Sequence, residues 1–286
     1  MTRVTKIAEM KAAVRALKAR RKTIGFVPTM GYLHEGHLSL VRESRRRSKA
    51  TVVSIFVNPL QFGPLEDFRE YPRDLARDAR ILENEGVDYL FCPRDSEMYP
   101  RGYKATVEVA GLQDTLCGRS RPGHFRGVAT VVLKLFHIVA PDEAFFGQKD
   151  AQQAVILKRM VEDLNLDVRI RVLPTVRDRD GLALSSRNTY LSAEERRAAL
   201  VLFRSLEEAK RMFAAGERRT APIIKRMRAL VAAEPLARVD YIEAVHLEDL
   251  SQAAVIKREV LIALAVFIGS TRLIDNVILR MGGRRQ

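Results

Sequence analysis

The sequence is poor in the residues that mark disulfide, zinc and membrane proteins. Its 286 residues include two cysteines, Cys92 and Cys117, and no tryptophan. The cysteines form neither a C-x-x-C pair nor a Cys/His cluster with zinc spacing, which argues against a disulfide framework and a structural zinc site. The longest nearly uncharged stretch, Val260–Thr271, has twelve residues, whereas a membrane-spanning helix needs about 20. We therefore expect neither a membrane protein nor a disulfide scaffold.

Signals for secretion and for repeat architectures are also missing. Charged residues from Arg3 to Lys11 interrupt the apolar region that a signal peptide would need. No segment repeats at a fixed period, which excludes the solenoid folds. Hydrophobic residues make up 47% and charged residues 29% of the chain, proportions typical of a globular protein. We expect a cytoplasmic protein with one large domain or two smaller ones.

Basic residues are in clear excess. Lys and Arg number 49 against 35 Asp and Glu, which gives a net charge of +14. This sign favours anionic partners, namely nucleotides, nucleic acid or acidic metabolites. The densest basic run, Arg42–Lys49, contains no aromatic residue that could stack on a base. We interpret this run as a solvated helix face, and a basic RNA-binding protein stays an alternative.

Alternating strand and helix patterns in the first part of the chain predict an α/β fold. Short β-branched and aromatic runs predict buried strands at 23–29, 51–58, 89–93, 144–146 and 169–173. Helical patterns lie between them, at 37–49, 72–86, 127–139 and 150–164. This order predicts a Rossmann-like parallel sheet with helices on both faces.

The pattern changes near residue 192. Two helical stretches, 192–215 and 221–233, precede two strand-like runs, Val239–Val245 and Glu259–Ile268. We therefore predict two domains, a Rossmann-like catalytic domain at 1–175 and a smaller α+β domain at 176–286. The boundary lies near Pro174–Val176, where no flexible low-complexity linker is present.

The most informative segment is Pro28–His37, which reads P-T-M-G-Y-L-H-E-G-H. It lies where the first predicted strand ends and a helix begins, the place where α/β sheets bind ligands and helix N-termini bind anions. If the helix begins near Glu35, the side chains of His34 and His37 can reach one phosphate-sized group. A zinc site is less consistent with this segment, because zincins space their histidines as H-E-x-x-H.

Two further segments have the composition of phosphate-binding turns. Gly147–Asp150 follows a short predicted strand and opens a helix, so Lys149 could neutralise phosphate while Asp150 caps the helix or binds a ribose hydroxyl. A helix cap beside a surface lysine is the structural alternative. Ser185–Arg187 offers two hydroxyls and a guanidinium in a polar loop. Its alternative is a series of capping residues before the capping box that begins at Ser192.

These motifs resemble the pantothenate synthetases (pantoate–β-alanine ligases), a family of the nucleotidyltransferase-like Rossmann folds with an H-x-G-H motif. Five more signatures of that family follow in order: Val57–Phe62, Arg121–Val128, Phe146–Gln153, Leu184–Asn188 and Arg272–Asn276. The resemblance covers nearly the whole chain. It implies condensation of pantoate with β-alanine at the expense of ATP, through a pantoyl-adenylate, with release of AMP and pyrophosphate. It also implies Mg²⁺ bound with ATP, a homodimer, and a C-terminal domain that closes over the nucleotide.

The resemblance also implies site residues. Catalytic roles fall on His34, His37, Lys149, Ser185, Ser186 and Arg187. The residues implied to bind ATP are Met30, Gly31, Tyr32, Leu33, His34, Glu35, Gly36, His37, Gly147, Gln148, Lys149, Asp150, Val176, Leu184, Ser185, Ser186 and Arg187. The residues implied to bind pantoate are Gln61 and Gln153, whose neutral amides suit hydroxyls and a carboxylate. Taken alone, each is more often a surface amide.

Three other residues carry less specific signals. Arg121 and His124 lie in a Pro/Gly loop that suits a carboxylate or pyrophosphate, or that is merely a charged turn. Asp78 could help to hold magnesium through water, although a solvated helix carboxylate is the more common case. No residue is identified as the base for the amine of β-alanine.

The chain departs from the family pattern at Tyr32, Leu184 and Ala151, where a small residue, methionine and a bulkier residue are usual. A leucine in place of methionine conserves apolar volume, whereas Tyr32 adds bulk beside the nucleotide loop. Another H-x-G-H adenylyl or nucleotidyl transferase stays an alternative. A tRNA-charging enzyme is disfavoured because the chain has no room for an anticodon-binding domain and no obvious K-M-S-K-S loop.

Overall fold

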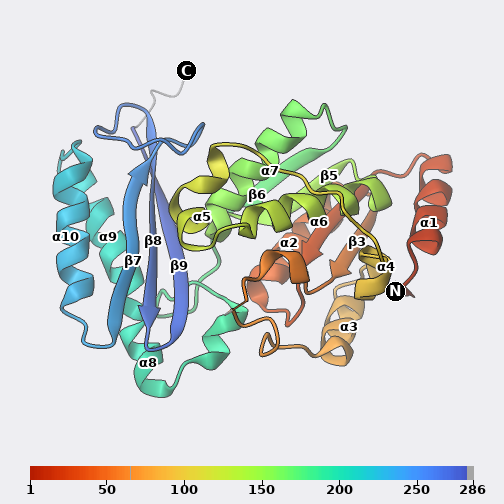
Figure 1. The fold of residues 1–286 in the computed structure, drawn as a ribbon, viewed down its shortest axis with the longest axis horizontal. Coiled ribbons are helices and arrows are strands. Elements are labelled where there is room, and N and C mark those ends of the chain that lie inside the picture. Colours follow the sequence, from red (N-terminus) through yellow and green to blue (C-terminus); the bar gives the residue numbers. More distant parts are fainter. Residues whose placement is uncertain (65, 282–286) are drawn as a thin grey trace.

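The first sheet contains six strands, all parallel, in the order β1-β4-β3-β2-β5-β6. It is seen in a computed structural model that describes residues 1–64 and 66–281 (Figure 1). The strands are β1 (Thr2–Val4), β2 (Ile24–Thr29), β3 (Ala50–Ile55), β4 (Tyr89–Phe91), β5 (Glu143–Gly147) and β6 (Arg169–Leu173). The predicted parallel sheet is confirmed.

Helices cover both faces of this sheet, as the alternating pattern predicts. Helices α1 (Ile7–Ala19), α6 (His124–Val139) and α7 (Ala151–Asp163) pack on one face, where Phe26 is fully buried. Helices α2 (Glu35–Arg47) and α3 (Leu75–Asn84) pack on the other, where the next residue, Val27, is fully buried. Neighbouring residues of one strand thus enter different cores, because their side chains alternate between faces.

Shorter elements complete this part of the chain. They are α4 (Asp95–Met98), α5 (Leu116–Ser120) and the 3₁₀ helices η1 (Pro59–Gln61), η2 (Leu112–Asp114), η3 (Gln148–Asp150) and η4 (Ser186–Tyr190).

The strand order places a switch point between β2 and β5, which are neighbours in the sheet. The chain leaves β2 towards β3 on one side and leaves β5 towards β6 on the other. The connections therefore diverge, and a crevice opens beyond the carboxyl ends of these two strands. The predicted H-x-G-H segment follows β2 and the predicted lysine turn follows β5, so the topology brings the two segments together.

The C-terminal part contains an antiparallel sheet of three strands in the order β7-β8-β9. The strands are β7 (Ala237–Val245), β8 (Glu259–Ile268) and β9 (Thr271–Arg280), and the helices are α8 (Ala193–Ala198), α9 (Leu200–Ala214) and α10 (Thr220–Ala232). The predicted α+β character is confirmed, but the prediction of two strands is wrong because β9 was not expected. The boundary between residues 175 and 176 stays a prediction.

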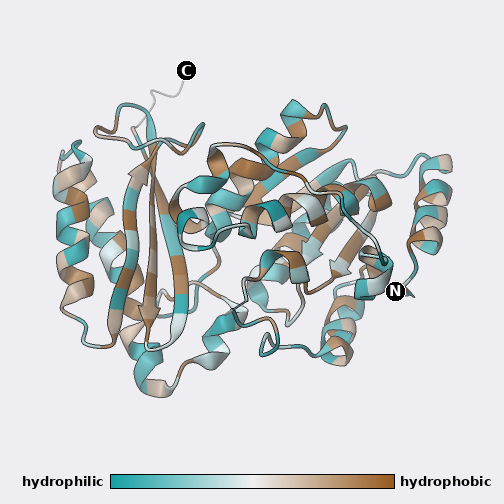
Figure 2. Ribbon diagram, in the orientation of Figure 1, coloured by the Kyte–Doolittle hydropathy of each residue, from teal (hydrophilic) through white to brown (hydrophobic). Residues whose placement is uncertain are grey.

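The second sheet lies between α9 and α10 on one side and the part of the chain with the six-stranded sheet on the other (Figure 1). Ile262 and Leu264 of β8 belong to the core shared with α9 and α10, whereas Leu261 and Ala263 belong to the core that also contains Phe26 and the inner faces of α1, α6 and α7. Figure 2 shows hydrophobic residues along β8, as expected for a strand buried on both faces.

Several element boundaries differ from the sequence-based expectation. The strand expected to reach Asn58 ends at Ile55. Asn58 instead begins η1, because its side chain accepts a hydrogen bond from Leu60 N and Pro59 has no N–H to donate to a sheet. The prediction also missed β1 and α1. In the part of the chain that the structure describes, no helix is long and apolar enough to cross a membrane.

Candidate active site

The two histidines of the H-x-G-H segment form the N-terminus of α2. His34 is the capping residue, and its Nδ1 accepts a hydrogen bond from Gly36 N at 3.1 Å. Nδ1 of His37 accepts from His34 N at 3.3 Å, and the two ring centroids lie 4.0 Å apart. A Cβ at position 36 would lie 2.9 Å from His34 Nδ1, so a larger residue there would displace the His34 ring. Both Nδ1 atoms are acceptors, so each neutral imidazole carries its proton on Nε2.

The surroundings keep both histidines uncharged. Burial, followed by the positive charge of Lys149, lowers the pKa of His34 to about 4. Burial, followed by His34 and Lys149, holds the pKa of His37 well below its ordinary value. The site therefore presents two neutral N–H donors at a helix N-terminus, where the backbone N–H groups also attract anions.

A buried carboxylate fixes the turn before these histidines. Asp78 of α3 is fully buried, and its oxygens accept from Tyr32 N at 2.7 Å and Leu33 N at 2.9 Å. Burial raises the pKa of Asp78, which the two backbone donors oppose. The interpretation of Asp78 as a solvated helix carboxylate is therefore wrong. Its contact with magnesium through water stays a prediction.

Tyr32 is accommodated by an unusual backbone conformation. Its φ of +50° lies in the left-handed region, which a bulky residue occupies only when its surroundings hold it there. The hydrogen bond from Tyr32 N to Asp78 provides this constraint. The guanidinium of Arg77 lies over the Tyr32 ring, 5.2 Å from its centroid. The extra bulk of this departure from the family pattern is thus packed against α3.

The serine–arginine loop contacts the histidine turn directly. Ser186 Oγ donates to Tyr32 O at 3.3 Å, and the side chain of Ser185 accepts from Arg187 N at the start of η4. Arg187 donates two hydrogen bonds of 2.8 Å to the carboxylate of Asp67. Burial acts to lower the pKa of Arg187, but the pairing with Asp67 outweighs it and raises this pKa.

A second arginine is paired in the same way. Arg121 donates to both carboxylate oxygens of Glu66, and it also donates to Gln61 O at 3.2 Å. His124 Nδ1 lies 2.8 Å from the same carbonyl oxygen. Burial, followed by the charge of Arg121, lowers the pKa of His124 to about 4. Arg121 and His124 therefore contact the backbone of the residue that we predicted to bind pantoate.

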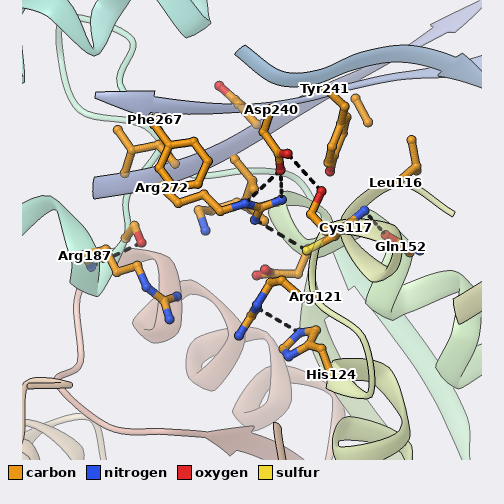
Figure 3. A pocket seen from close by; sticks show the side chains of 18 of the residues that line it. Leu116, Cys117, Arg121, His124, Gln152, Arg187, Asp240, Tyr241, Phe267 and Arg272 are labelled. Carbon is orange, nitrogen blue, oxygen red and sulfur yellow. Dashed lines mark hydrogen bonds and ion pairs between the residues drawn. The ribbon is translucent and has the colours of Figure 1, made fainter. Parts of the chain in front are cut away.

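Two cavities meet at these residues. The smaller, about 230 Å³, lies at the switch point of the sheet, and His34, His37, Gln61 and Leu184 are part of its wall. The larger, about 820 Å³, lies between the first domain and β7–β9 (Figure 3). The residues that line both cavities are Arg121, His124, Lys149, Asp150, Gln153, Ser185 and Arg187. His34 and His37 line only the smaller cavity, which makes it the candidate site for phosphate chemistry.

Most predicted site residues surround this smaller cavity. In addition to those named above, it is lined by Met30, Gly36, Gly147, Val176 and Ser186. Five predicted ATP contacts are not part of its wall, namely Gly31, Tyr32, Leu33, Glu35 and Gln148. Leu33 is buried in the core, Glu35 pairs with Arg42 in solvent, and Gln148 donates to Asn276. The structure thus gives these side chains other partners.

Some residues of the site were missed. Glu66 and Asp67 were not predicted, because their arginine partners lie 55 and 120 residues away in the sequence. Thr175 lines the smaller cavity, and its buried hydroxyl has no hydrogen-bond partner among the described residues. Its position two residues after the predicted strand 169–173 is the one signal that could have identified it.

A parallel sheet with histidine, lysine and serine–arginine segments around its switch point defines a nucleotidyltransferase-like α/β protein. A family model described as pantoate-beta-alanine ligase matches residues 2–278. The chain therefore belongs to the pantoate–β-alanine ligase family.

Individual relatives agree with this assignment along the whole chain. A pantothenate synthetase of Caldicellulosiruptor saccharolyticus is 57% identical over 98% of this chain and 100% of the relative. The crystal structure of the pantothenate synthetase of Thermus thermophilus matches with a TM-score of 0.93 and 46% identity, over 97% of this chain and 99% of that one. A ligase of Francisella tularensis, crystallised with β,γ-ATP and β-alanine, matches with a TM-score of 0.81 and 33% identity, over 97% of each chain.

Proposed function

We propose that this protein condenses pantoate with β-alanine at the expense of ATP, through a pantoyl-adenylate. The observation that carries this proposal is the cluster of His34, His37, Lys149 and Ser185–Arg187 around one cavity whose wall also contains Gln61 and Gln153. Phosphate-binding groups and neutral amides thus face the same space. This is the arrangement needed to bring a carboxylate to a phosphorus atom.

In the first half-reaction, a carboxylate oxygen of pantoate attacks the α-phosphorus of ATP, and the bond to pyrophosphate breaks. Negative charge shifts to the oxygens of the leaving group in this step. The Nε2–H groups of His34 and His37, together with Lys149, would stabilise that charge as fixed donors. Neutral histidines suit this role, because they donate hydrogen bonds without giving up a proton.

Gln61 is held in a position that suits pantoate. Its Oε1 accepts from Asn58 Nδ2 at 3.0 Å, and its Nε2 lies 3.2 Å from the sulfur of Met30. Asn58 is itself fixed by Gly127 O and Tyr99. Such a supported amide can bind a hydroxyl or carboxylate with little loss of side-chain entropy on binding. Gln153 would contribute a second amide from α7.

The two arginines would change partners during the reaction. In the structure Arg187 is paired with Asp67 and Arg121 with Glu66. Burial acts to raise the pKa of both acids, but the hydrogen bonds from the arginines lower it, so both remain ionised. A phosphate or a substrate carboxylate can replace them, since arginine binds both anions with the same two-pronged geometry.

In the second half-reaction, the neutral amine of β-alanine attacks the carbonyl carbon of the mixed anhydride. The bond to AMP breaks, the amide of pantothenate forms, and the nitrogen releases a proton. Magnesium would enter with ATP. Its chief ligands would be phosphate oxygens and water, as Mg²⁺ prefers.

We further propose the broader features that the family implies. These are a cytoplasmic location, a homodimer, and domains at 1–175 and 176–286 of which the second closes over the nucleotide. The separation of the two sheets in the chain and the large cavity between them support the two domains and their closure. The location and the homodimer rest on the family resemblance.

The decisive experiment measures AMP release with ATP, pantoate and β-alanine, omitting each in turn. AMP should form only when all three are present. Exchange of pyrophosphate into ATP should require pantoate but not β-alanine. A folded His37→Ala variant should lose exchange by a factor on the order of 10²–10³, the usual effect of removing one positioned donor. Exchange that does not depend on pantoate would instead favour another nucleotidyl transferase.

A further inference from the structure

The Arg272–Asn276 signature has no role in the reaction as described above. It lies on β9, outside the first sheet, and two of its residues are buried and polar. Asp275 is 3% exposed and Asn276 is 4% exposed. Burying a carboxylate and an amide is costly unless each finds partners. Their partners show what these residues do.

Asn276 holds the lysine turn of the first domain. Its Nδ2 donates to Gln148 O at 2.8 Å and to Lys149 O at 2.9 Å, and its Oδ1 accepts from Gln148 Nε2 at 3.2 Å. Two carbonyl oxygens at this distance require the NH₂ group, so the orientation of the amide is fixed. Both N–H bonds are used, and Asn276 therefore has no donor left for a substrate.

Asp275 holds the segment that carries the serine–arginine loop. Its two oxygens accept from Arg177 Nη1 at 2.6 Å and Nη2 at 2.9 Å. Arg177 Nη1 also donates to Gly181 O, and its backbone pairs with Ala183 in an antiparallel bridge. Ser185 follows two residues later. The ion pair thus fixes the chain directly before Ser185–Arg187.

The side chains of Asp275 and Asn276 lie on opposite faces of the sheet because they are consecutive residues of one strand. Consecutive side chains of β9 point to opposite faces of the sheet. Accordingly Leu273 belongs to the core with α9 and α10, whereas Ile274 packs against the core of the first domain. Asp275 shares the face of Leu273, and Asn276 that of Ile274.

We infer that Asp275 and Asn276 are positioning residues, which set the distance between Lys149 and the Ser185–Arg187 loop through one rigid strand. This inference rests on the proposed function, because it concerns the same phosphate chemistry. One peptide unit of β9 separates the two anchors, so the spacing of two phosphate-binding segments far apart in the sequence depends on a single piece of backbone. Asn276 acts through Lys149 and does not touch the reacting atoms.

The test compares Asn276→Ala and the smaller perturbation Asn276→Ser with Thr220→Val. Thr220 is also a buried residue of the second domain whose side chain donates to two backbone carbonyls, those of Ala253 and Ala254. It lines neither cavity. Thr220→Val should lower the melting temperature and leave turnover unchanged. Both Asn276 variants should lower kcat for pantoate-dependent pyrophosphate exchange by about 10²-fold, the effect of a misplacement near 1 Å, with little change in the pantoate KM.

A double-mutant cycle separates positioning from a general structural role. If Asn276 acts through Lys149, adding Asn276→Ala to a Lys149→Ala variant should cause little further loss of exchange. The same fold-loss in both backgrounds would overturn the inference, as would wild-type kcat in both folded Asn276 variants. A wild-type protein that shows no pantoate-dependent exchange would instead refute the proposed function, so the two failures are distinguishable.

Discussion

The protein should lose stability in mild acid because its active-site histidines resist protonation. The pKa of His34 is lowered by burial, and then by Lys149, to about 4, whereas a histidine of the unfolded chain titrates near 6.5. Between these values the unfolded state binds more protons than the folded state. The stabilising contribution is therefore complete above pH 6.5 and is lost as the pH falls towards 4.

The size of this effect follows from the two pKa values. A difference of one unit between the pKa values of the folded and unfolded states corresponds to about 1.4 kcal/mol of folding free energy. At pH 5 the unfolded His34 is almost fully protonated and the folded one is still almost neutral, so acidification from pH 7 removes about 2 kcal/mol through this residue. His37 and His124 act in the same direction, because their pKa values are lowered too.

Denaturant unfolding at pH 7 and pH 5 measures this loss. His34→Gln should reduce the loss by about 2 kcal/mol, and His246→Gln, which removes an exposed histidine, serves as the matched control. Nitrogen NMR of labelled histidine should show His34 and His37 as neutral Nε2–H tautomers at pH 6. A charged His34 at pH 6, or equal acid losses in wild type and His34→Gln, would refute the argument.

Three further predictions follow from individual contacts. Gln61→Ala and Gln153→Ala should each raise the KM for pantoate far more than the KM for ATP, and an equal rise in both would mean that these amides only support the fold. Asp78→Asn replaces one acceptor of the Tyr32 and Leu33 N–H groups, so it should lower the free energy of unfolding by about 1–3 kcal/mol; an unchanged denaturation midpoint would contradict this. Changing Arg45, Arg46 and Arg47 together to Gln should leave turnover nearly unchanged, because surface substitutions usually have small effects, and RNA binding should be weak and lost as salt rises. Tight, salt-resistant RNA binding that the triple change abolishes would require a second function.

Local sequence patterns predicted most of the fold correctly. The errors occur where contacts between residues far apart in the sequence decide the structure. The runs at 169–173 and 259–268 coincide with β6 and β8, because both are bounded by turn signals. Strand β9 was missed because Arg272, Asp275 and Asn276 interrupt its apolar pattern. Gly269 is the sequence signal that could have indicated this strand. It begins a two-residue turn between Ile268 and Thr271, and its φ is +55°. The polar residues of β9 contact other segments of the chain.

The same distinction applies to the site. The histidine, lysine and serine segments could be predicted because each combines its chemistry with a turn within a few residues. The partners of Arg121 and Arg187 could not, since the loop that carries Glu66 and Asp67 has no local pattern that indicates arginine contacts. The solvated interpretation of Asp78 failed for the same reason, because its partners Tyr32 and Leu33 lie more than 40 residues earlier.

Several arginines of the basic run and of the site already have carboxylate partners in the structure, although the chain as a whole keeps a net charge of +14. Within the basic run, Arg42 pairs with Glu35 and Glu85, and Arg47 pairs with Glu143. The two site arginines have carboxylate partners as well, and the histidines are neutral. The charges of these four arginines are therefore compensated locally before any substrate arrives. In the proposed reaction, a phosphate or a substrate carboxylate binds by replacing Glu66 or Asp67, so each arginine exchanges one anionic partner for another and is never left without one.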